Sequence, residues 1–265
     1  MADVSVMKKA LEEIEKGKEL AIATITKSEG STPRGRGTVM AVLRDRSIIG
    51  TIGGGALENR VIELSLEAIK KGESISLNLP LNAEGIEMTC GGEVDVFIDV
   101  YKKNPKLILI GGGHVSYAIY KIASLLEFDI VIFEDREEFL NEERFPLASE
   151  LVLGPVELKL REYDIDENAY IVIASRGHKY DQESLEAVVD SKARYIGAMG
   201  SKRKVITMKD NLKEKGLSEE NLNKVYAPVG LNLSSGTPEE IAISIIAEIL
   251  IVKNEGNGKH MKLGE

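Results

Sequence analysis

Residues 107–136, LILIGGGHVSYAIYKIASLLEFDIVIFEDR, decide the fold of this chain. The four apolar residues that open the stretch are enough for a short buried strand and too few for a buried helix. Three glycines follow, then apolar residues at helical spacing, and then a second apolar run that ends in Glu134 and Asp135. Strand, glycine turn, helix, strand and acid come in the order of a dinucleotide-binding βαβ unit. The stretch therefore predicts a Rossmann-like α/β domain with a mostly parallel sheet.

The same residues suit a ligand that carries phosphate. Gly111 allows a tight turn out of the strand, and Gly113 lets the backbone approach a phosphate without an intervening Cβ atom. The helix that follows offers unpaired N–H groups and the positive end of its dipole. Glu134 or Asp135 would accept hydrogen bonds from two ribose hydroxyls. Ser116 replaces the third glycine of the pattern, so the fold could equally hold another phosphorylated ligand, or none.

Composition excludes several classes of protein. The chain has 265 residues, 43% hydrophobic and 29% charged, which suits two domains of moderate size or one large domain with a packed core. No apolar run approaches the length of a membrane span, and the first residues are too charged for a signal peptide. A net charge of −9 argues against nucleic-acid binding as the main task. One cysteine, Cys90, excludes an internal disulfide and fits a reducing cytoplasm.

The first part of the chain predicts a mixed α+β domain. Apolar spacing predicts helices over residues 4–17 and after residue 55, and strands over residues 19–26, 38–43, 47–51, 75–79 and 94–100. A polar, proline-bearing linker follows at residues 102–106. We therefore place a domain boundary there, which gives an N-terminal domain of residues 1–103 and a C-terminal domain of residues 104–265.

The loop SEGSTPRGRG, residues 28–37, has two interpretations. Its polar, glycine-rich composition is typical of a mobile hairpin loop. Its two arginines, Arg34 and Arg36, could instead form an anion clamp, because guanidinium groups bind phosphate in a bidentate fork.

A second glycine turn, formed by Gly53, Gly54 and Gly55, comes before a predicted helix. Backbone N–H groups at such a turn could meet an anion. Glu58 lies in the first turn of that helix, where a carboxylate is favourable for structural reasons alone.

Cys90 lies in a Thr-Cys-Gly-Gly turn, just before a predicted strand. Cysteine is more often a small buried hydrophobe than a reactive group. Two following glycines, however, leave few side-chain neighbours, which favours an exposed thiol with a functional role. One thiol alone cannot build a zinc site.

In the C-terminal domain, further strands are predicted over residues 151–153, 170–174 and 195–198. Arg176, His178 and Asp181 follow the second of these, at a strand end where open α/β sheets bind ligands, so we regard them as candidate catalytic residues. His114 lies at the same edge by topology. After the third strand, Gly200 and Ser201 could open a helix near an anion, or only begin a basic helix that faces solvent.

The last predicted helix covers residues 238–252. Thr237 should be its N-cap, Pro238 its first residue, and Glu240 the partner in a capping box. Because most faces of the helix are apolar, it should be buried, either against the Rossmann sheet or in a subunit interface. We therefore predict a homodimer.

Taken together, GSTPRGRG, TIGGGALE, TCGG, LILIGGGHV, SRGHKYD, IGAMGSKRK and PVGLNLSSGTPEEIA resemble the XdhC/CoxI family of xanthine dehydrogenase accessory factors. The resemblance runs from about residue 19 to residue 252, in the family order. It implies an α+β XdhC/CoxI domain followed by a Rossmann-like domain. Ser116 is one departure from the family pattern, and Tyr226 and Ala227, before Pro228 where the family often has a histidine, are another.

The resemblance also implies a function. Family members bind molybdenum cofactor, support its sulfuration and deliver it to a molybdenum hydroxylase such as xanthine dehydrogenase. The implied partners are the hydroxylase apoenzyme and, as a second candidate, a cysteine desulfurase. Arg34, Arg36 and the glycine turn at residues 53–55 would hold the cofactor phosphate. Cys90 matches the family's cysteine, and its thiolate suits contact with molybdenum or with sulfur.

Two other functions stay open at this point. The Rossmann unit, together with Arg176, His178 and Asp181, also fits an NAD(P)-dependent oxidoreductase. A nucleotide-sensing regulatory module would use the Rossmann domain to control a partner. We expect a cofactor-binding maturation factor rather than a turnover enzyme.

Overall fold

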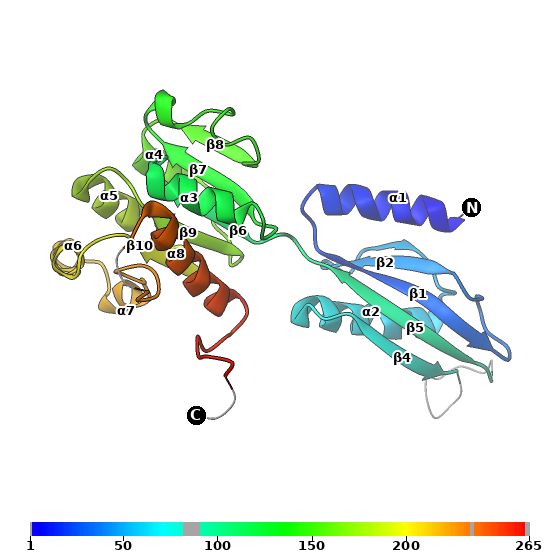
Figure 1. The fold of residues 1–265 in the computed structure, drawn as a ribbon. Coiled ribbons are helices and arrows are strands. Elements are labelled where there is room, and N and C mark those ends of the chain that lie inside the picture. The colour runs from blue at the N-terminus through cyan, green and yellow to red at the C-terminus, as the bar shows by residue number, and fades with distance from the viewer. Residues whose placement is uncertain (1, 82–90, 234–235, 263–265) are drawn as a thin grey trace. The chain divides into compact units, whose positions relative to one another are not determined.

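The computed structural model describes residues 2–81, 91–233 and 236–262. The chain folds into two compact units, Met1–Lys103 and Asn104–Glu265, which we call the N-terminal and C-terminal units (Figure 1). Each unit contains a five-stranded sheet. No helix among the described residues combines the length and apolarity that crossing a bilayer requires.

The N-terminal sheet is antiparallel, with the strand order β3-β2-β1-β5-β4. Its strands are β1 (Leu20–Glu29), β2 (Val39–Leu43), β3 (Ile48–Gly50), β4 (Ile75–Pro80) and β5 (Glu93–Tyr101). The first strand lies at the centre of the sheet and pairs with the last, so the sheet joins both ends of the unit.

A helix covers each face of this sheet (Figure 1). Alternate residues of a strand point to opposite faces. Leu20 and Ile22 of β1 accordingly pack in a core with Ala10 of α1 (Ala2–Glu15). Ala21 and Ala23 pack on the other face with α2 (Gly55–Lys71). The strand is therefore buried on both sides, which explains its nearly continuous apolar sequence.

The C-terminal sheet is parallel throughout, with the strand order β10-β9-β6-β7-β8. Its strands are β6 (Lys106–Ile110), β7 (Asp129–Glu134), β8 (Glu150–Leu153), β9 (Ala169–Ile173) and β10 (Tyr195–Ala198). The chain forms β6 first and later returns to place β9 on its other side. This reversal creates a topological switch point between β6 and β9, where such sheets bind ligands. The predicted Rossmann-like fold is confirmed.

Helices cover both faces of this sheet and complete two cores. α3 (His114–Ala123) and α8 (Pro238–Lys253) pack on the face that carries Leu107 and Leu109. The opposite face, which carries Ile108 and Ile110, packs against residues of α4 (Val156–Glu162), α5 (His178–Val188), α6 (Lys202–Glu214) and α7 (Glu219–Asn223). The sequence did not predict α4 or α7, because each is too short to show a helical period.

The capping box predicted for α8 is confirmed. The Thr237 hydroxyl accepts from the Glu240 N–H at 3.4 Å, the Glu240 carboxylate accepts from the Thr237 N–H at 2.8 Å, and Pro238 is the first helical residue. The apolar side of α8, with Ile245 and Ile249, is fully buried against its own unit. Most of the apolar character of this helix is thus accounted for within one chain, although Ile243 is half exposed, and the homodimer stays a prediction.

Candidate functional site

The glycine turn after β6 needs glycine at two of its three positions. A Cβ atom on Gly111 would lie 2.6 Å from the Ala174 carbonyl oxygen, and one on Gly112 would lie 2.4 Å from the Phe139 carbonyl oxygen. Both contacts are with backbone, which cannot easily move aside. Gly113 is different, because a Cβ there would meet no described atom within 4 Å. The space beside Gly113 is therefore open to a ligand.

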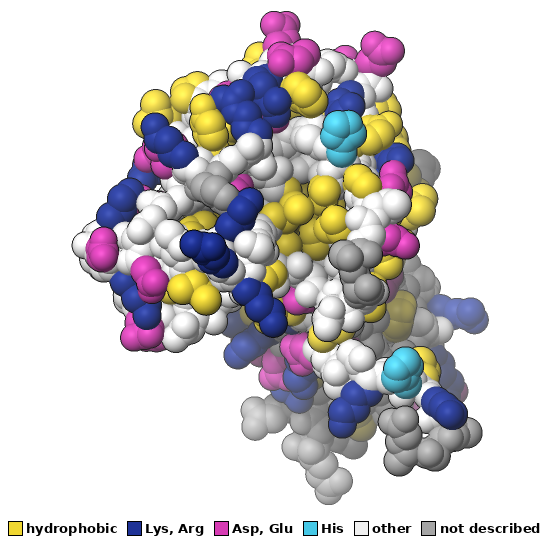
Figure 2. Space-filling view, turned by 60° about the vertical axis from the view of Figure 1, so that its left-hand side comes forward, with side chains coloured by type: hydrophobic (Ala, Val, Ile, Leu, Met, Phe, Trp, Pro, Cys, Tyr) yellow, Lys and Arg dark blue, Asp and Glu magenta, His cyan; other side chains and the backbone are white. Residues whose placement is uncertain are grey.

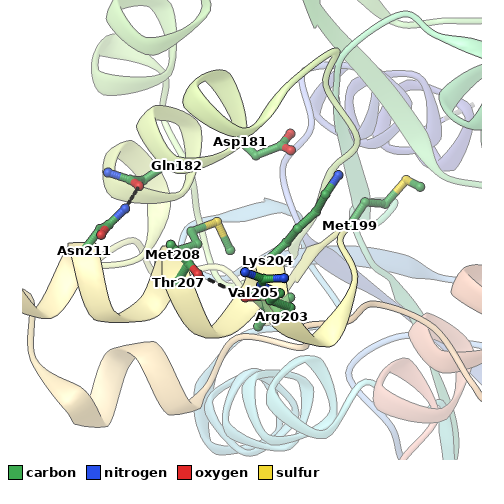
Figure 3. A pocket seen from close by; sticks show the side chains of 9 residues that line it. All are labelled: Asp181, Gln182, Met199, Arg203, Lys204, Val205, Thr207, Met208 and Asn211. Atoms are coloured by element: carbon green, nitrogen blue, oxygen red, sulfur yellow. Dashed lines mark hydrogen bonds between the residues drawn. The ribbon is translucent and has the colours of Figure 1, made fainter.

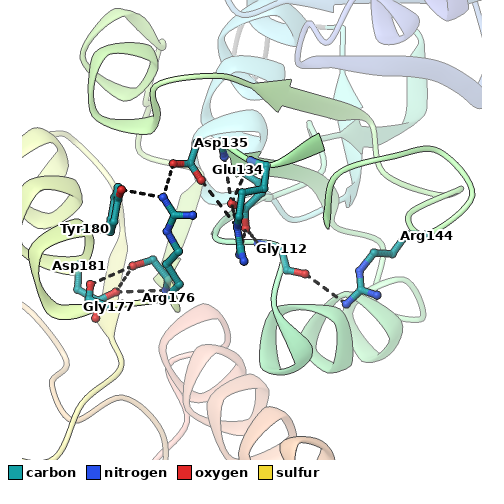
Figure 4. Close-up of polar contacts among 10 residues, drawn as sticks. Gly112, Glu134, Asp135, Arg144, Arg176, Gly177, Tyr180 and Asp181 are labelled. Carbon is teal, nitrogen blue, oxygen red and sulfur yellow. Dashed lines mark hydrogen bonds and ion pairs between the residues drawn. The ribbon is translucent and has the colours of Figure 1, made fainter. Parts of the chain in front are cut away.

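Glu134, at the end of β7, holds this turn in place. Its side chain is only 4% exposed and accepts from the Gly112 N–H at 2.8 Å and from the Arg136 guanidinium at 2.9 and 3.0 Å (Figure 4). Burial acts to raise the pKa of Glu134, but the bonds from Arg136 and Gly112 outweigh it and lower the pKa to about 2. Glu134 is thus charged at neutral pH and fixes the turn with both of its oxygens.

Asp135, the other predicted ribose acceptor, is bound to a different loop. Its carboxylate accepts from Arg176 at 2.8 Å, and the same guanidinium nitrogen donates to the Tyr180 hydroxyl at 2.7 Å. Arg176 also stacks on the Tyr180 ring, 4.5 Å from its centre. Burial, and then the neighbouring Glu134, raise the pKa of Asp135. These contacts link the ends of β7 and β9 (Figure 4).

A cavity of about 550 Å³ lies at the switch point. Its lining includes Gly113, His114, Arg176, Gly177, Gly200 and Lys204. A second cavity of about 250 Å³ adjoins it between α5 and α6 and shares Asp181, Met199 and Lys204 with it. Figure 3 shows the Lys204 side chain extending from α6 towards the end of β10. On the face of the molecule in Figure 2, lysine and arginine side chains lie beside a hollow with hydrophobic side chains.

Two helices begin at the larger cavity without a side-chain cap. Gly113 is the N-cap of α3 and Gly177 the N-cap of α5, and glycine has no side chain to accept from the first N–H groups. The third helix there, α6, is capped by the Ser201 hydroxyl, which accepts from the Lys204 N–H at 3.4 Å. Of the two residues predicted at this turn, Ser201 is a cap and Gly200 lines the cavity.

Arg176, His178 and Asp181 lie at the same strand end, as expected, but Arg176 and Asp181 point apart. Arg176 turns towards Asp135, whereas Asp181 accepts from the Ser175 hydroxyl at 2.6 Å and from its N–H at 3.2 Å (Figure 4). Asp181 therefore orders the turn that leads into α5. The side chain of His178 lies outside the described part of the structure.

The sequence analysis did not select Lys204, although it lines both cavities. Lys204 lies three residues after the N-cap of α6, in the first turn of the helix, and this position was the one feature of the sequence that could have selected it. Ser175, whose hydroxyl and N–H both bond Asp181, was not selected either. A serine directly after a buried strand carries no distinguishing pattern.

The N-terminal unit brings three of its predicted motifs together. A Cβ on Gly53 would lie 2.4 Å from the Pro33 side chain and 3.5 Å from that of Arg34, so loop 28–37 packs on the glycine turn. A Cβ on Gly92 would lie 2.4 Å from the Ser31 carbonyl oxygen, so the end of the Thr-Cys-Gly-Gly motif packs on the same loop. Loop 28–37 thus connects the other two motifs.

At this junction the arginines are exposed and without ion pairs to described residues, whereas the Glu58 carboxylate is hydrogen-bonded to the glycine turn. Arg34 and Arg36 are exposed, and neither forms an ion pair with a described residue. Glu58, from α2, turns back into the glycine turn. Its carboxylate accepts from the Gly54 N–H at 3.3 Å, from the Ile52 N–H at 3.3 Å and from the Thr51 hydroxyl. The N–H of Gly54 therefore serves the protein's own carboxylate rather than an outside anion.

Cys90, the predicted metal or sulfur contact, lies outside the described residues. Within the described ranges, no group of three or more histidine, cysteine, aspartate or glutamate side chains could hold a metal ion.

Known proteins with similar sequences share both units. Residues 107–249 match the family described as the XdhC Rossmann domain, and residues 13–79 match the XdhC and CoxI family. The Escherichia coli (strain K12) protein named "Uncharacterized protein YqeB" is 40% identical over 90% of this chain and 44% of its own length. A Bacillus subtilis (strain 168) protein, named as a probable component of xanthine dehydrogenase, is 28% identical over 59% of this chain and 45% of its own length.

A shorter match covers 34% of this chain and 28% of the E. coli (strain K12) "Molybdenum cofactor insertion chaperone PaoD", at 28% identity. The chain thus spans less than half the length of these curated relatives. The crystal structure of a xanthine dehydrogenase from Bacillus halodurans aligns over 94% of this chain and 96% of its own, with a TM-score of 0.53 and 20% identity, and shares the fold. With both regions matched in the predicted order, the chain belongs to the XdhC and CoxI family.

Proposed function

We propose that this protein is a maturation factor that binds molybdenum cofactor, supports its sulfuration and delivers it to a molybdenum hydroxylase such as xanthine dehydrogenase. The names of two relatives, one a probable component of xanthine dehydrogenase and the other a molybdenum cofactor insertion chaperone, support a role of this kind. The observation that carries the proposal is the junction in the N-terminal unit, where loop 28–37 packs on both the glycine turn and Gly92.

The junction fits the phosphate of the cofactor. Arg34 and Arg36 are exposed and unpaired among the described residues, so their guanidinium groups are available to a dianion. A Cβ on Gly54 or Gly55 would meet none of the described atoms within 4 Å, so the turn leaves room beside them. Because the Gly54 N–H already donates to the Glu58 carboxylate, the arginines rather than the turn would hold the phosphate. The bound cofactor would supply a dithiolene-held molybdenum centre.

The Arg34 contact can be tested by titration. Arg34→Ala should weaken the affinity for molybdenum cofactor more at high salt than Lys102→Ala does. A bidentate contact made at the junction resists screening better than a contact from an exposed lysine near the end of the unit. Affinity is measured by fluorescence titration at low and high salt. Equal effects of the two substitutions would remove the anion-clamp interpretation.

Cys90 is proposed as the thiolate that handles sulfur or contacts the metal. A serine oxygen is a harder and far less acidic donor, so it would hold a soft metal centre or a persulfide poorly. Cys90→Ser should fold with an unchanged melting temperature and fail to activate a molybdenum hydroxylase in a reconstitution assay. Full activation by this variant would assign the sulfur chemistry to a partner.

The alternative to a maturation factor is an NAD(P)-dependent oxidoreductase, which the cavity of about 550 Å³ in the C-terminal unit supports. A thermal-shift screen separates the two functions, because a ligand that binds only the native state raises its melting temperature. Stabilisation by molybdenum cofactor, without stabilisation by NAD(P), supports the maturation factor. Consumption of NAD(P)H with a small carbonyl substrate would contradict it.

The partners follow from the same proposal. A hydroxylase apoenzyme should be captured from native extract by the tagged protein, and a cysteine desulfurase is the second expected partner. The homodimer is checked by sedimentation, where a monomer alone at micromolar concentration would contradict it.

A further inference from the structure

The ligand crevice of the C-terminal unit is open on one side and closed on the other. A Rossmann fold is built from two mononucleotide-binding halves that meet at the switch point. On the β7 side, the cavity lined by Glu134, Asp135 and Arg176 is about 20 Å³, room for about one water molecule. On the β9–β10 side, the cavity is about 550 Å³, within the range of about 300–1,000 Å³ of small-molecule pockets. This unequal division points to a ligand that occupies one half.

The closed half is filled by the protein's own polar contacts. In a dinucleotide site, the acid at the end of the second strand binds the adenosine ribose. Here both carboxylate oxygens of Glu134 already accept hydrogen bonds from the Gly112 N–H and the Arg136 guanidinium. Asp135 is bound by Arg176, whose guanidinium reaches across from the end of β9 and stacks on Tyr180. Adenosine would have to break the Arg176–Asp135 pair before its ribose could bind Asp135.

The open half has the charge that a phosphate requires. Lys204 lines it and forms no ion pair with a described residue. Asp181 is the one acid among the described lining residues, and its carboxylate is turned to Ser175 and only 9% exposed. The uncapped starts of α3 and α5 meet at the same cavity, with Gly113 and Gly177 as their N-caps. Neither glycine has a described atom within 4 Å of where its Cβ would be, so a ligand can approach the backbone closely.

We propose that this half-crevice binds a phosphorylated heterocycle of mononucleotide size, with its phosphate between Lys204 and the start of α3. Arg176 is a specificity-determining residue in this site, because its pair with Asp135 excludes the adenosine half of a dinucleotide. The site belongs to the C-terminal unit and does not depend on the proposed binding of molybdenum cofactor by the N-terminal unit.

Nicotinamide mononucleotide and NAD⁺ form a matched pair of probes, because the second is the first extended by adenosine monophosphate. Isothermal titration of the full chain should show nicotinamide mononucleotide binding at least ten times more tightly than NAD⁺. Adenosine monophosphate should compete with neither. If the mononucleotide does not bind at millimolar concentration, or if NAD⁺ binds as tightly, the proposal is overturned.

Substitutions test the roles proposed for Lys204 and Arg176. Lys204→Ala should weaken binding of the mononucleotide about tenfold, since a charge-assisted contact to phosphate is lost. Lys202→Ala, an exposed lysine on the same helix that does not line the cavity, should leave it unchanged. Arg176→Ala should raise the affinity for NAD⁺ about tenfold, because Asp135 becomes free for ribose. An Arg176→Ala protein that still rejects NAD⁺, with its melting temperature unchanged, would overturn the role of the ion pair.

Discussion

The chain contains two strand–glycine turn–helix segments, and a carboxylate holds each turn, but the two carboxylates come from different places. In the N-terminal unit, Glu58 comes from the helix that follows the turn, and it accepts from the Gly54 N–H four residues back. In the C-terminal unit, Glu134 comes from the neighbouring strand and accepts from Gly112, 22 residues away in sequence. The first turn is held locally, whereas the second is held by the sheet.

The two turns also differ in how far backbone angle accounts for their glycines. In the first turn, Gly53, Gly54 and Gly55 all have positive φ angles, of 127°, 76° and 64°, which favour glycine over any other residue. In the second turn, Gly111 also has a positive φ angle, of 107°, but Gly112 has none and is required because the Phe139 backbone approaches it. A run of three glycines in sequence therefore does not reveal whether backbone angle or space is the constraint.

The largest expected effect comes from a clash with backbone. Gly112→Ala should lower the free energy of unfolding of the C-terminal unit by about 3 kcal/mol, because its methyl group would overlap the Phe139 carbonyl oxygen. Gly54→Ala should cost only about 1 kcal/mol, the strain of a positive φ angle without a clash. Urea unfolding of both variants measures the difference. An equal cost would show that angle and space are not separate constraints here.

The next effect distinguishes the two carboxylates. Glu134→Gln should cost about 3 kcal/mol at neutral pH, because the partly buried Arg136 guanidinium loses its close carboxylate partner and keeps only Asp135, 3.9 Å away. Glu58→Gln should cost about 1 kcal/mol, the value of ordinary hydrogen bonds at a half-buried site. Denaturant midpoints at pH 7 measure both. A larger loss for Glu58→Gln would reverse the comparison.

The pH dependence of stability should identify Glu134 independently. Its folded pKa of about 2 lies below its ordinary value of 4.5, so the unfolded chain binds the proton more readily. The resulting stability is fully present above about pH 5 and is lost as the pH falls towards 2, by roughly 2–3 kcal/mol. Glu134→Gln should flatten this loss, as measured by urea unfolding between pH 7 and pH 3. A wild-type-like slope in the variant would contradict the low pKa.

The smallest effect concerns two matched serines in the helices after the turns. Ser65 of α2 and Ser116 of α3 are fully buried, and neither hydroxyl has a partner among the described residues. An unpaired buried hydroxyl destabilises the folded state, so Ser65→Ala and Ser116→Ala should each raise the unfolding free energy by up to about 1 kcal/mol. Melting temperatures check this. A decrease in either variant would show that its hydroxyl has a partner after all.

Local signals in the sequence were enough for the fold. The strand, turn and helix of residues 107–123 and the capping box of Thr237 with Glu240 depend on neighbours in sequence, and both could be predicted. The short helix α4 could not, because seven residues show too little periodicity. The family resemblance, carried by motifs from both units, is confirmed by the matches over residues 13–79 and 107–249.

The site was less predictable because its contacts join distant positions. The sequence pattern offered Glu134 and Asp135 as alternatives, but only Glu134, the last residue of β7, accepts from the glycine turn, whereas Asp135, just past the strand, accepts from Arg176. The Arg176–Asp135 pair spans 41 residues and depends on β9 returning to pair with β6, whose other neighbour is β7. Lys204 reaches the cavity only because α6 starts beside α5. Strand order decides each of these contacts, and no local pattern records it.

The strand order of the two sheets also determines at what point during synthesis each unit can complete its sheet and cover it with helices. In the N-terminal unit, β5 pairs with β1, so the sheet is complete once residue 101 has been made. In the C-terminal unit, α8 covers a face formed by Leu107 and Leu109 of β6 together with residues of β7 and β9. α3 covers part of that face early, but the part that α8 covers has no helix over it until residues 238–253 have been made. A nascent chain paused before residue 238 would therefore expose part of an apolar sheet face, a kind of surface that chaperones bind and that promotes aggregation.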